Sequence, residues 1–123
     1  MIPARELYAA SALFRKTLKY AEQLKPDKIF ILSDKYHVVE LDELRGKYEK
    51  DLRKESLQER KKWAQNTLKK LQKKGCQLEK DTFIFLTGEI HYENLISSMK
   101  NHQEPMKGLK IGEKLHWLNE RIK

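Results

Sequence analysis

The sequence predicts an α/β fold of three layers, in which a short parallel sheet, incomplete as it stands, carries helices on both faces. Two short, continuous apolar runs, Ile29–Leu32 and Phe83–Leu86, are typical of strands that are covered on both sides. Amphipathic helical patterns lie between and around these runs. Because a right-handed crossover packs the intervening helix back onto the sheet, this alternation favours parallel strands.

The first helix is expected over Leu7–Leu24, where apolar residues recur every three or four positions. It ends before Pro26, because proline cannot continue a helix. The strand Ile29–Leu32 follows. From Asp34 to Leu52 the charges are mixed, and we expect an ordered loop with one brief extended piece.

The second helix begins at Ser56, which forms a capping box with Glu59. It is expected to stop near Gly75, since glycine accepts the left-handed conformation that ends helices. Its apolar side consists of Trp63, Ala64, Thr67, Leu68 and Leu71.

The strand Phe83–Leu86 is followed by a third helix just after Gly88, and a closing helix carries Leu115, Leu118 and Ile122. Two parallel strands alone leave open sheet edges. Either the loop after Ser33 supplies another strand, or a first strand is missing, or a second chain completes the sheet.

The chain has 123 residues, which predicts a single domain over 1–123. Cys76 is its only cysteine, so no internal disulfide and no paired-cysteine metal motif can form. No signal peptide or membrane-spanning run is visible, and a cytoplasmic location is expected. The formal net charge of +8 favours polyanionic partners.

Ligands of open parallel sheets bind beyond the carboxyl ends of the strands. There we expect hydroxyls, a lysine, and backbone N–H groups at a helix start to hold an anionic ligand, with tyrosines on which a base stacks. The candidate ligand-binding residues are Ser33, Asp34, Lys35, Tyr36, Thr87, Gly88 and Tyr92, with Tyr48 as a further stacking surface. Each has a structural alternative: Ser33 caps a turn, Tyr36 packs, and Gly88 serves a tight turn.

The histidines show no metal-ligand spacing, so neither a metal nor a cofactor is expected. Asp34 and His37 are close enough in sequence to be considered as a base and its orienting group, although the catalytic residues stay unassigned. In the second helix, basic side chains recur at helical spacing and form a stripe able to follow phosphates, or else a solvated outer face. The stripe consists of Lys69, Lys70, Lys73 and Lys74.

Several motifs together resemble a family of short bacterial and phage-borne proteins known only as a domain of unknown function. They are Ala4–Tyr8, Leu32–Tyr36, Trp63-Ala64, Phe85–Gly88 and the tail Pro105–Leu118. The chain more remotely resembles the YaaA-type peroxide-stress proteins, which bind DNA. The resemblance implies a three-layer α/β fold related to the uracil-DNA glycosylase group, and work on nucleic acid.

The chain departs from that pattern in two ways. Family members usually begin with an extra strand before the segment matching Ala4, and this strand is not seen here. The family tends to have glycine where this chain has His37, and proline where it has Lys47. A lost glycine closes off the approach of backbone to a ligand.

The leading hypothesis is a domain that binds nucleic acid or a nucleotide. One alternative is a base-processing hydrolase or glycosylase-like enzyme in which Asp34 or Glu89 positions water. The other is a non-catalytic interaction protein, with a homo-oligomer or a partner chain completing the sheet.

Overall fold

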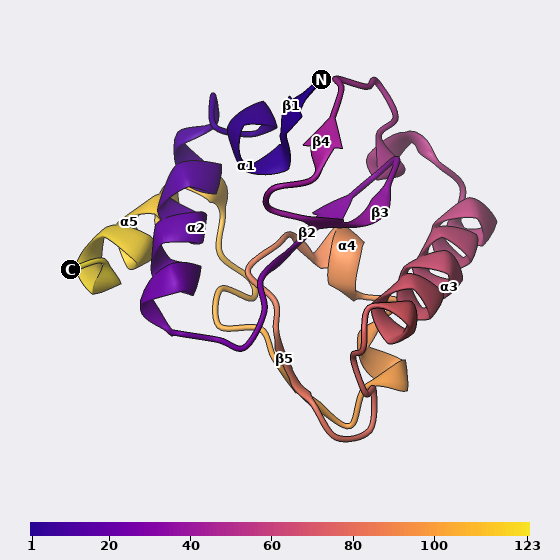
Figure 1. The fold of residues 1–123 in the computed structure, drawn as a ribbon. Coiled ribbons are helices and arrows are strands. Elements are labelled where there is room, and N and C mark those ends of the chain that lie inside the picture. Colours follow the sequence, from indigo (N-terminus) through magenta and orange to yellow (C-terminus); the bar gives the residue numbers. More distant parts are fainter. The chain divides into compact units, whose positions relative to one another are not determined.

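The computed structural model describes residues 1–123 and has the expected α/β composition, with helices and short sheets in alternation (Figure 1). The sheets are small. The strands form three separate two-stranded sheets in place of the single parallel sheet that the sequence predicted.

The apolar runs each form a strand, β2 (Phe30–Ser33) and β5 (Thr82–Ile84). They were expected to be neighbours, but β2 pairs with β3 (His37–Glu40) and β5 pairs with β6 (Asn101–Gln103). The β5–β6 pair is parallel, with Phe83 opposite His102. Because pairing partners are chosen by contacts distant in sequence, the apolar runs alone did not identify them.

The third sheet joins the start of the chain to the predicted loop. β1 (Ile2–Pro3) runs antiparallel to β4 (Leu44–Arg45), and Figure 1 shows the two strands side by side. The segment after Asp34 therefore contains two strands, β3 and β4, where one brief extended piece was expected.

The first predicted helix is interrupted. α1 (Ala4–Leu7) ends after one turn, and α2 (Ala12–Gln23) begins after Ser11, whose side chain accepts a hydrogen bond from the Phe14 N–H at 3.2 Å. The Ala4 N–H donates to the Glu43 carbonyl at 2.8 Å, which ties the first turn to the segment beside β4. Apolar spacing alone does not reveal this break, because both halves follow the same period.

The helix α3 (Leu57–Lys73) agrees closely with its prediction. The Ser56 side chain accepts from the Glu59 N–H at 3.1 Å, and all the residues of its predicted apolar side are buried. Lys74 is the C-cap, and Gly75 follows with φ 95°. Local signals determined this element, since caps and the helical period both lie within the segment itself.

The remaining helical elements are short until the end of the chain. They are η1 (Leu52–Lys54), α4 (Glu89–Tyr92) and η2 (Ile96–Ser98), followed by α5 (Ile111–Arg121). The expected third helix is thus only the four residues of α4.

The chain forms two compact units, each assembled from segments that are distant in sequence. The first unit contains residues 1–31, 40–47 and 106–123, and in it α2 packs against α5, with Tyr20 and Trp117 in an edge contact at 5.2 Å. The second unit contains residues 32–39 and 48–105. Most of the buried apolar side chains belong to the second unit, among them Val38, Val39, Leu52, Trp63, Ala64, Leu68, Leu71, Phe85 and Leu95.

Candidate functional site

The turn that follows β2 lies in the second unit and is organised by Ser33. The Ser33 side chain is 0% exposed. Its Oγ accepts hydrogen bonds from the backbone N–H groups of Lys35, at 3.3 Å, and Tyr36, at 2.9 Å, and it donates to the Tyr48 hydroxyl at 3.2 Å. Ser33 therefore takes the turn-building role that was the structural alternative to ligand contact.

Two side chains of α3 hold the same turn. The indole Nε1 of Trp63 donates to the Ser33 carbonyl at 3.0 Å, and the Lys70 Nζ donates to the Tyr36 carbonyl at 2.8 Å. Both acceptors are backbone atoms. The turn is thus fixed to α3 independently of the side chains that it presents.

Asp34 connects this turn to the segment after β5. Its Oδ2 accepts from the Leu52 N–H at 2.9 Å, and its Oδ1 lies 2.5 Å from His91 Nε2. The two side chains are only 18% and 22% exposed. The contact therefore joins the turn after β2 to α4, although β2 and β5 belong to separate sheets.

The Asp34 carboxyl is held in its charged form. Burial on its own raises the pKa, but the hydrogen bonds from His91 and from the Leu52 N–H outweigh burial, so that the pKa lies below its ordinary value. Asp34 therefore pairs with His91 and not with His37, the neighbour that the sequence suggested.

The other nitrogen of His91 does not face solvent. Nδ1 is buried and makes no hydrogen bond, and the ring meets Trp63 edge-on at 5.8 Å. Thr87 Oγ1 is likewise buried without a partner. The Asp34–His91 pair therefore holds two segments together, and it does not present a base to the surface.

His37 occupies an unusual backbone position directly after the turn. Its φ is 67°, the left-handed region that favours glycine, and its ring stacks on Trp63 at 6.3 Å. Burial lowers the pKa of His37, and the nearby charges of Lys70 and Lys50 lower it further. Two cations, Lys70 and Lys50, therefore act on His37.

The segment after β5 starts a short helix. Gly88 is the N-cap of α4, which has four residues and so provides only a short run of backbone N–H groups. Tyr92 is 4% exposed and packs against Phe85 at 5.7 Å between ring centroids. Tyr92 is therefore a packed aromatic, whereas Thr87 and Gly88 are half-buried and stay candidates for ligand contact.

Lys35 and Tyr36 are the members of the predicted site that reach the surface of the turn. Lys35 is exposed, and its Nζ lies 5.3 Å from the centre of the Tyr36 ring. Tyr36 is half-buried and meets Tyr48 edge-on at 5.6 Å. A cation and an aromatic ring thus lie together at a turn that backbone contacts hold in place.

The predicted lysine stripe divides into two kinds of side chain. Lys69 and Lys73 are exposed on the outer face of α3. Lys70 and Lys74 are half-buried, and Lys70 is bound to the Tyr36 carbonyl. Adjacent positions of a helix face different directions, so Lys69 and Lys73 differ from Lys70 and Lys74. The spacing of the lysines does not show which of the two pairs faces solvent.

The outer face of α3 is more basic than the stripe alone. No Asp or Glu occurs from residue 60 to residue 78. The exposed lysines, which form no ion pair, alternate with amide side chains on the surface. These residues, called the basic face below, are Lys61, Lys62, Gln65, Asn66, Lys69, Gln72 and Lys73.

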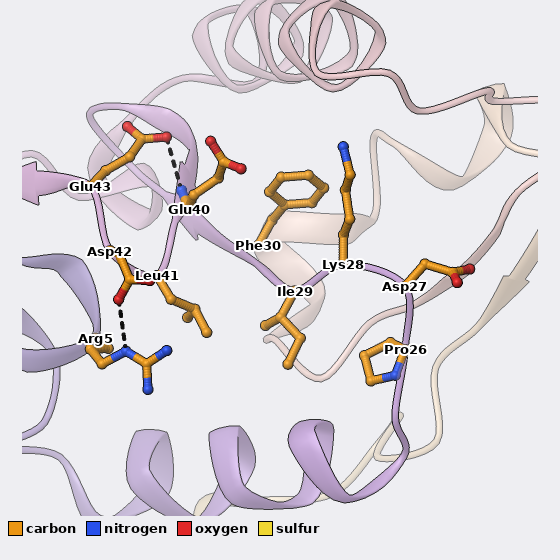
Figure 2. Close-up of a pocket in the computed structure, with 10 residues that line it drawn as sticks. All are labelled: Arg5, Pro26, Asp27, Lys28, Ile29, Phe30, Glu40, Leu41, Asp42 and Glu43. Atoms are coloured by element: carbon orange, nitrogen blue, oxygen red, sulfur yellow. Dashed lines mark hydrogen bonds and ion pairs between the residues drawn. The ribbon is translucent and has the colours of Figure 1, made fainter.

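A separate hollow of about 580 Å³ lies within the first unit, between the start of β2 and the segment that joins β3 to β4 (Figure 2). Its lining has mixed charge. Arg5 pairs with Asp42 at 3.2 Å, and the Glu40 N–H donates to Glu43 at 3.0 Å, as the dashed lines of Figure 2 show. The lining has four carboxylates, those of Asp27, Glu40, Asp42 and Glu43, and two cations, Arg5 and Lys28, so it does not favour an anionic ligand.

Two further observations concern metal binding and membrane-spanning helices. The chain contains no group of three or more His, Cys, Asp or Glu side chains placed to hold a metal ion. None of its helices combines the length and the apolar character that a membrane span requires.

Comparison with known proteins gives one match. The model of a family of unknown function, DUF6884, matches residues 1–120. No curated protein and no solved structure gives a significant match. The family resemblance seen in the motifs is confirmed in this respect, whereas these comparisons lend no support to the YaaA-type and uracil-DNA glycosylase relationships.

Proposed function

We propose, from the premise that this chain belongs to the DUF6884 family of unknown function, that it binds nucleic acid through the basic face of α3. The observation that carries the proposal is the absence of carboxylates from residue 60 to residue 78, combined with exposed lysines that are not paired. Phosphate backbones are recognised by such lysines in a salt-dependent manner.

The geometry of α3 suits an extended anion. Lys62, Lys69 and Lys73 follow one another at spacings of seven and four residues, which places them along one side of the helix. At 1.5 Å per residue the three lysines span roughly 16 Å of helix axis. Gln65 lies between them, and amide groups bind phosphate and sugar oxygens as well as base edges.

The proposal places the anionic ligand on α3 and not in the crevice between the two turns. Ser33 and Tyr92 are buried inside the second unit, and the Asp34 carboxylate would repel a phosphate there. Lys35 stays within the proposed surface, because the Lys70 contact joins its turn to α3.

The hydrolase alternative has less support. Both oxygens of Asp34 are engaged by Leu52 and His91, so this carboxylate is not available to position water. Glu89 is exposed at the start of α4, and no acid, base and nucleophile converge around it. We therefore propose binding without catalysis.

The test is the salt dependence of binding to a fluorescently labelled oligonucleotide, compared between two double variants. Lys69→Gln with Lys73→Gln removes two charges from the basic face, and glutamine preserves helix propensity. Lys19→Gln with Lys107→Gln removes the same charge from exposed positions of the first unit. Net charge is then equal in the two proteins.

We expect only the first double variant to lose affinity. Two phosphate contacts contribute about 1.4 to 1.8 to the slope of log affinity against log salt concentration. They therefore account for roughly a sevenfold to twelvefold change in affinity between about 50 and 200 mM salt, and the first double variant should lose this part of the salt dependence. Equal losses in both variants would mean that binding follows overall charge and not this face. The absence of binding at low salt in the unsubstituted protein would refute the proposal.

A further inference from the structure

We infer that the nucleic acid is single-stranded and that an unpaired base stacks on Tyr36, an inference that rests on the proposed function. Lysines on α3 contact phosphates of single strands and duplexes alike. The choice between these two classes depends on whether the surface also offers an aromatic ring to an unstacked base. The turn after β2 offers one.

The turn that carries Tyr36 is joined to α3 through its backbone. The Lys70 Nζ donates to the Tyr36 carbonyl at 2.8 Å, and Lys70 is flanked on α3 by Lys69 and, one turn on, by Lys73. Lys35 is exposed in the same turn, and its Nζ lies 5.3 Å from the centre of the Tyr36 ring. A phosphate bound by Lys35 therefore leaves the neighbouring base beside the ring.

The ring is held in place before any ligand binds. The Tyr36 N–H donates to Ser33 Oγ at 2.9 Å, and the ring meets Tyr48 edge-on at 5.6 Å. Trp63 fixes the Ser33 carbonyl on the other side of the turn. A ring that is already ordered loses little conformational entropy when a base stacks on it.

The surrounding charges favour a phosphate beside this ring. Lys35 is exposed, with its Nζ 5.3 Å from the Tyr36 ring centre, and the charges of Lys70 and Lys50 both act on the adjacent His37. The nearby carboxylates are engaged, Asp34 by His91 and Asp51 by Arg53 at 3.1 Å. When a base stacks, the Lys35 ammonium can exchange its weak contact with the ring for one with a phosphate.

The contacts of this turn allow a clean substitution. Tyr36 is held by its backbone N–H and carbonyl, so Tyr36→Leu removes the ring and keeps both hydrogen bonds. Tyr36→Phe retains the ring and serves as the matched control. Far-ultraviolet circular dichroism and thermal unfolding establish that both variants are folded.

The experiment measures fluorescence anisotropy with one labelled, mixed-sequence DNA strand, alone and annealed to its complement, at the same low salt. We expect Tyr36→Leu to lower the affinity for the single strand by about tenfold, within the range of roughly 5- to 150-fold known for removal of a stacking ring. The duplex affinity should not change. Tyr36→Phe should bind both probes as the unsubstituted protein does.

The outcomes separate this inference from the proposed function. If the Lys69 and Lys73 double variant weakens binding and Tyr36→Leu does not, stacking is wrong while binding by α3 stands. Equal losses of single-strand and duplex binding in Tyr36→Leu also overturn stacking. If adenosine monophosphate competes as effectively as the unlabelled strand, the site takes a nucleotide and the single-strand inference fails. If neither probe binds, the proposed function itself fails.

Discussion

Replacement of Asp34 by alanine is expected to destabilise the second unit strongly. The substitution removes the acceptor for the Leu52 N–H, at 2.9 Å, and for His91 Nε2, at 2.5 Å. Leu52 is 1% exposed, so its N–H would be left without water or protein as a partner. Both hydrogen bonds go to a charged group, and at about 1.5 kcal/mol each they amount to about 3 kcal/mol.

The assay is urea unfolding followed by circular dichroism, supported by thermal unfolding. A loss of about 3 kcal/mol corresponds to a decrease of roughly 12 °C in Tm, at about 4 °C per kcal/mol for a chain of this size. Asp34→Asn keeps one acceptor, so its expected loss is about 1.5 kcal/mol.

An exposed carboxylate provides the control. Asp42→Ala breaks the ion pair with Arg5, in which the Asp42 side chain is 85% exposed, and surface pairs of this kind contribute about 0 to 1 kcal/mol. If Asp34→Ala costs no more than Asp42→Ala, the two hydrogen bonds contribute nothing net to folding. The view that Asp34 fixes the turn would then be wrong.

Two further outcomes follow from the structure. The pKa of Asp34 is lower in the folded chain than its ordinary value of 3.8, so its contribution to stability is complete above that value and is lost as the pH falls through the folded-state pKa. Acid titration of the free energy of unfolding below about pH 4 should therefore be steeper for the unsubstituted protein than for Asp34→Asn, and parallel curves would contradict the assignment. Ser56→Ala should cost about 1 kcal/mol in urea unfolding and Ser56→Gly only a few tenths, because Ser56 caps α3 through a side-chain bond at 3.1 Å; no loss of stability in Ser56→Ala would show that this bond does not stabilise the helix.

Elements with local signals were predicted well. The cap at Ser56, the buried face of α3 and the stop at Gly75 all follow from residues inside the element, and the structure contains each of them. Pairing of strands depends on distant partners and was not predicted. β6 (Asn101–Gln103) contains no apolar residue, so hydrophobic periodicity gives it no signal at all.

The candidate site was also predicted only in part, because its contacts join residues that are distant in sequence. Asp34 follows the first apolar strand and His91 lies beyond the second, and a contact joins them, although the two strands do not share the sheet that the sequence predicted. The sequence suggested His37 as the partner of Asp34 because it is only three positions away. Ser33 and Tyr92 were chosen by residue type, and both are buried inside the second unit.

The backbone at His37 agrees with the glycine that the family resemblance implies at this position. The structure gives His37 a φ of 67°, a region that favours glycine. A residue with a Cβ in this region costs roughly 1 to 2 kcal/mol relative to its preferred conformation. The stacking of His37 on Trp63 offsets part of this cost, so the turn keeps the backbone path of a glycine while it carries an aromatic side chain.

The division of the lysine stripe connects stability to the proposed binding. Lys70 bonds to the Tyr36 carbonyl and is part of the framework of the turn, whereas Lys69 and Lys73 point to solvent and are available to phosphate. Neutralising Lys70 therefore changes the position of the turn as well as the charge, and any loss of binding would have two causes. Neutralising Lys69 and Lys73 changes charge alone. For this reason the double variant at Lys69 and Lys73, and not a variant of the whole stripe, distinguishes an electrostatic surface from a structural one.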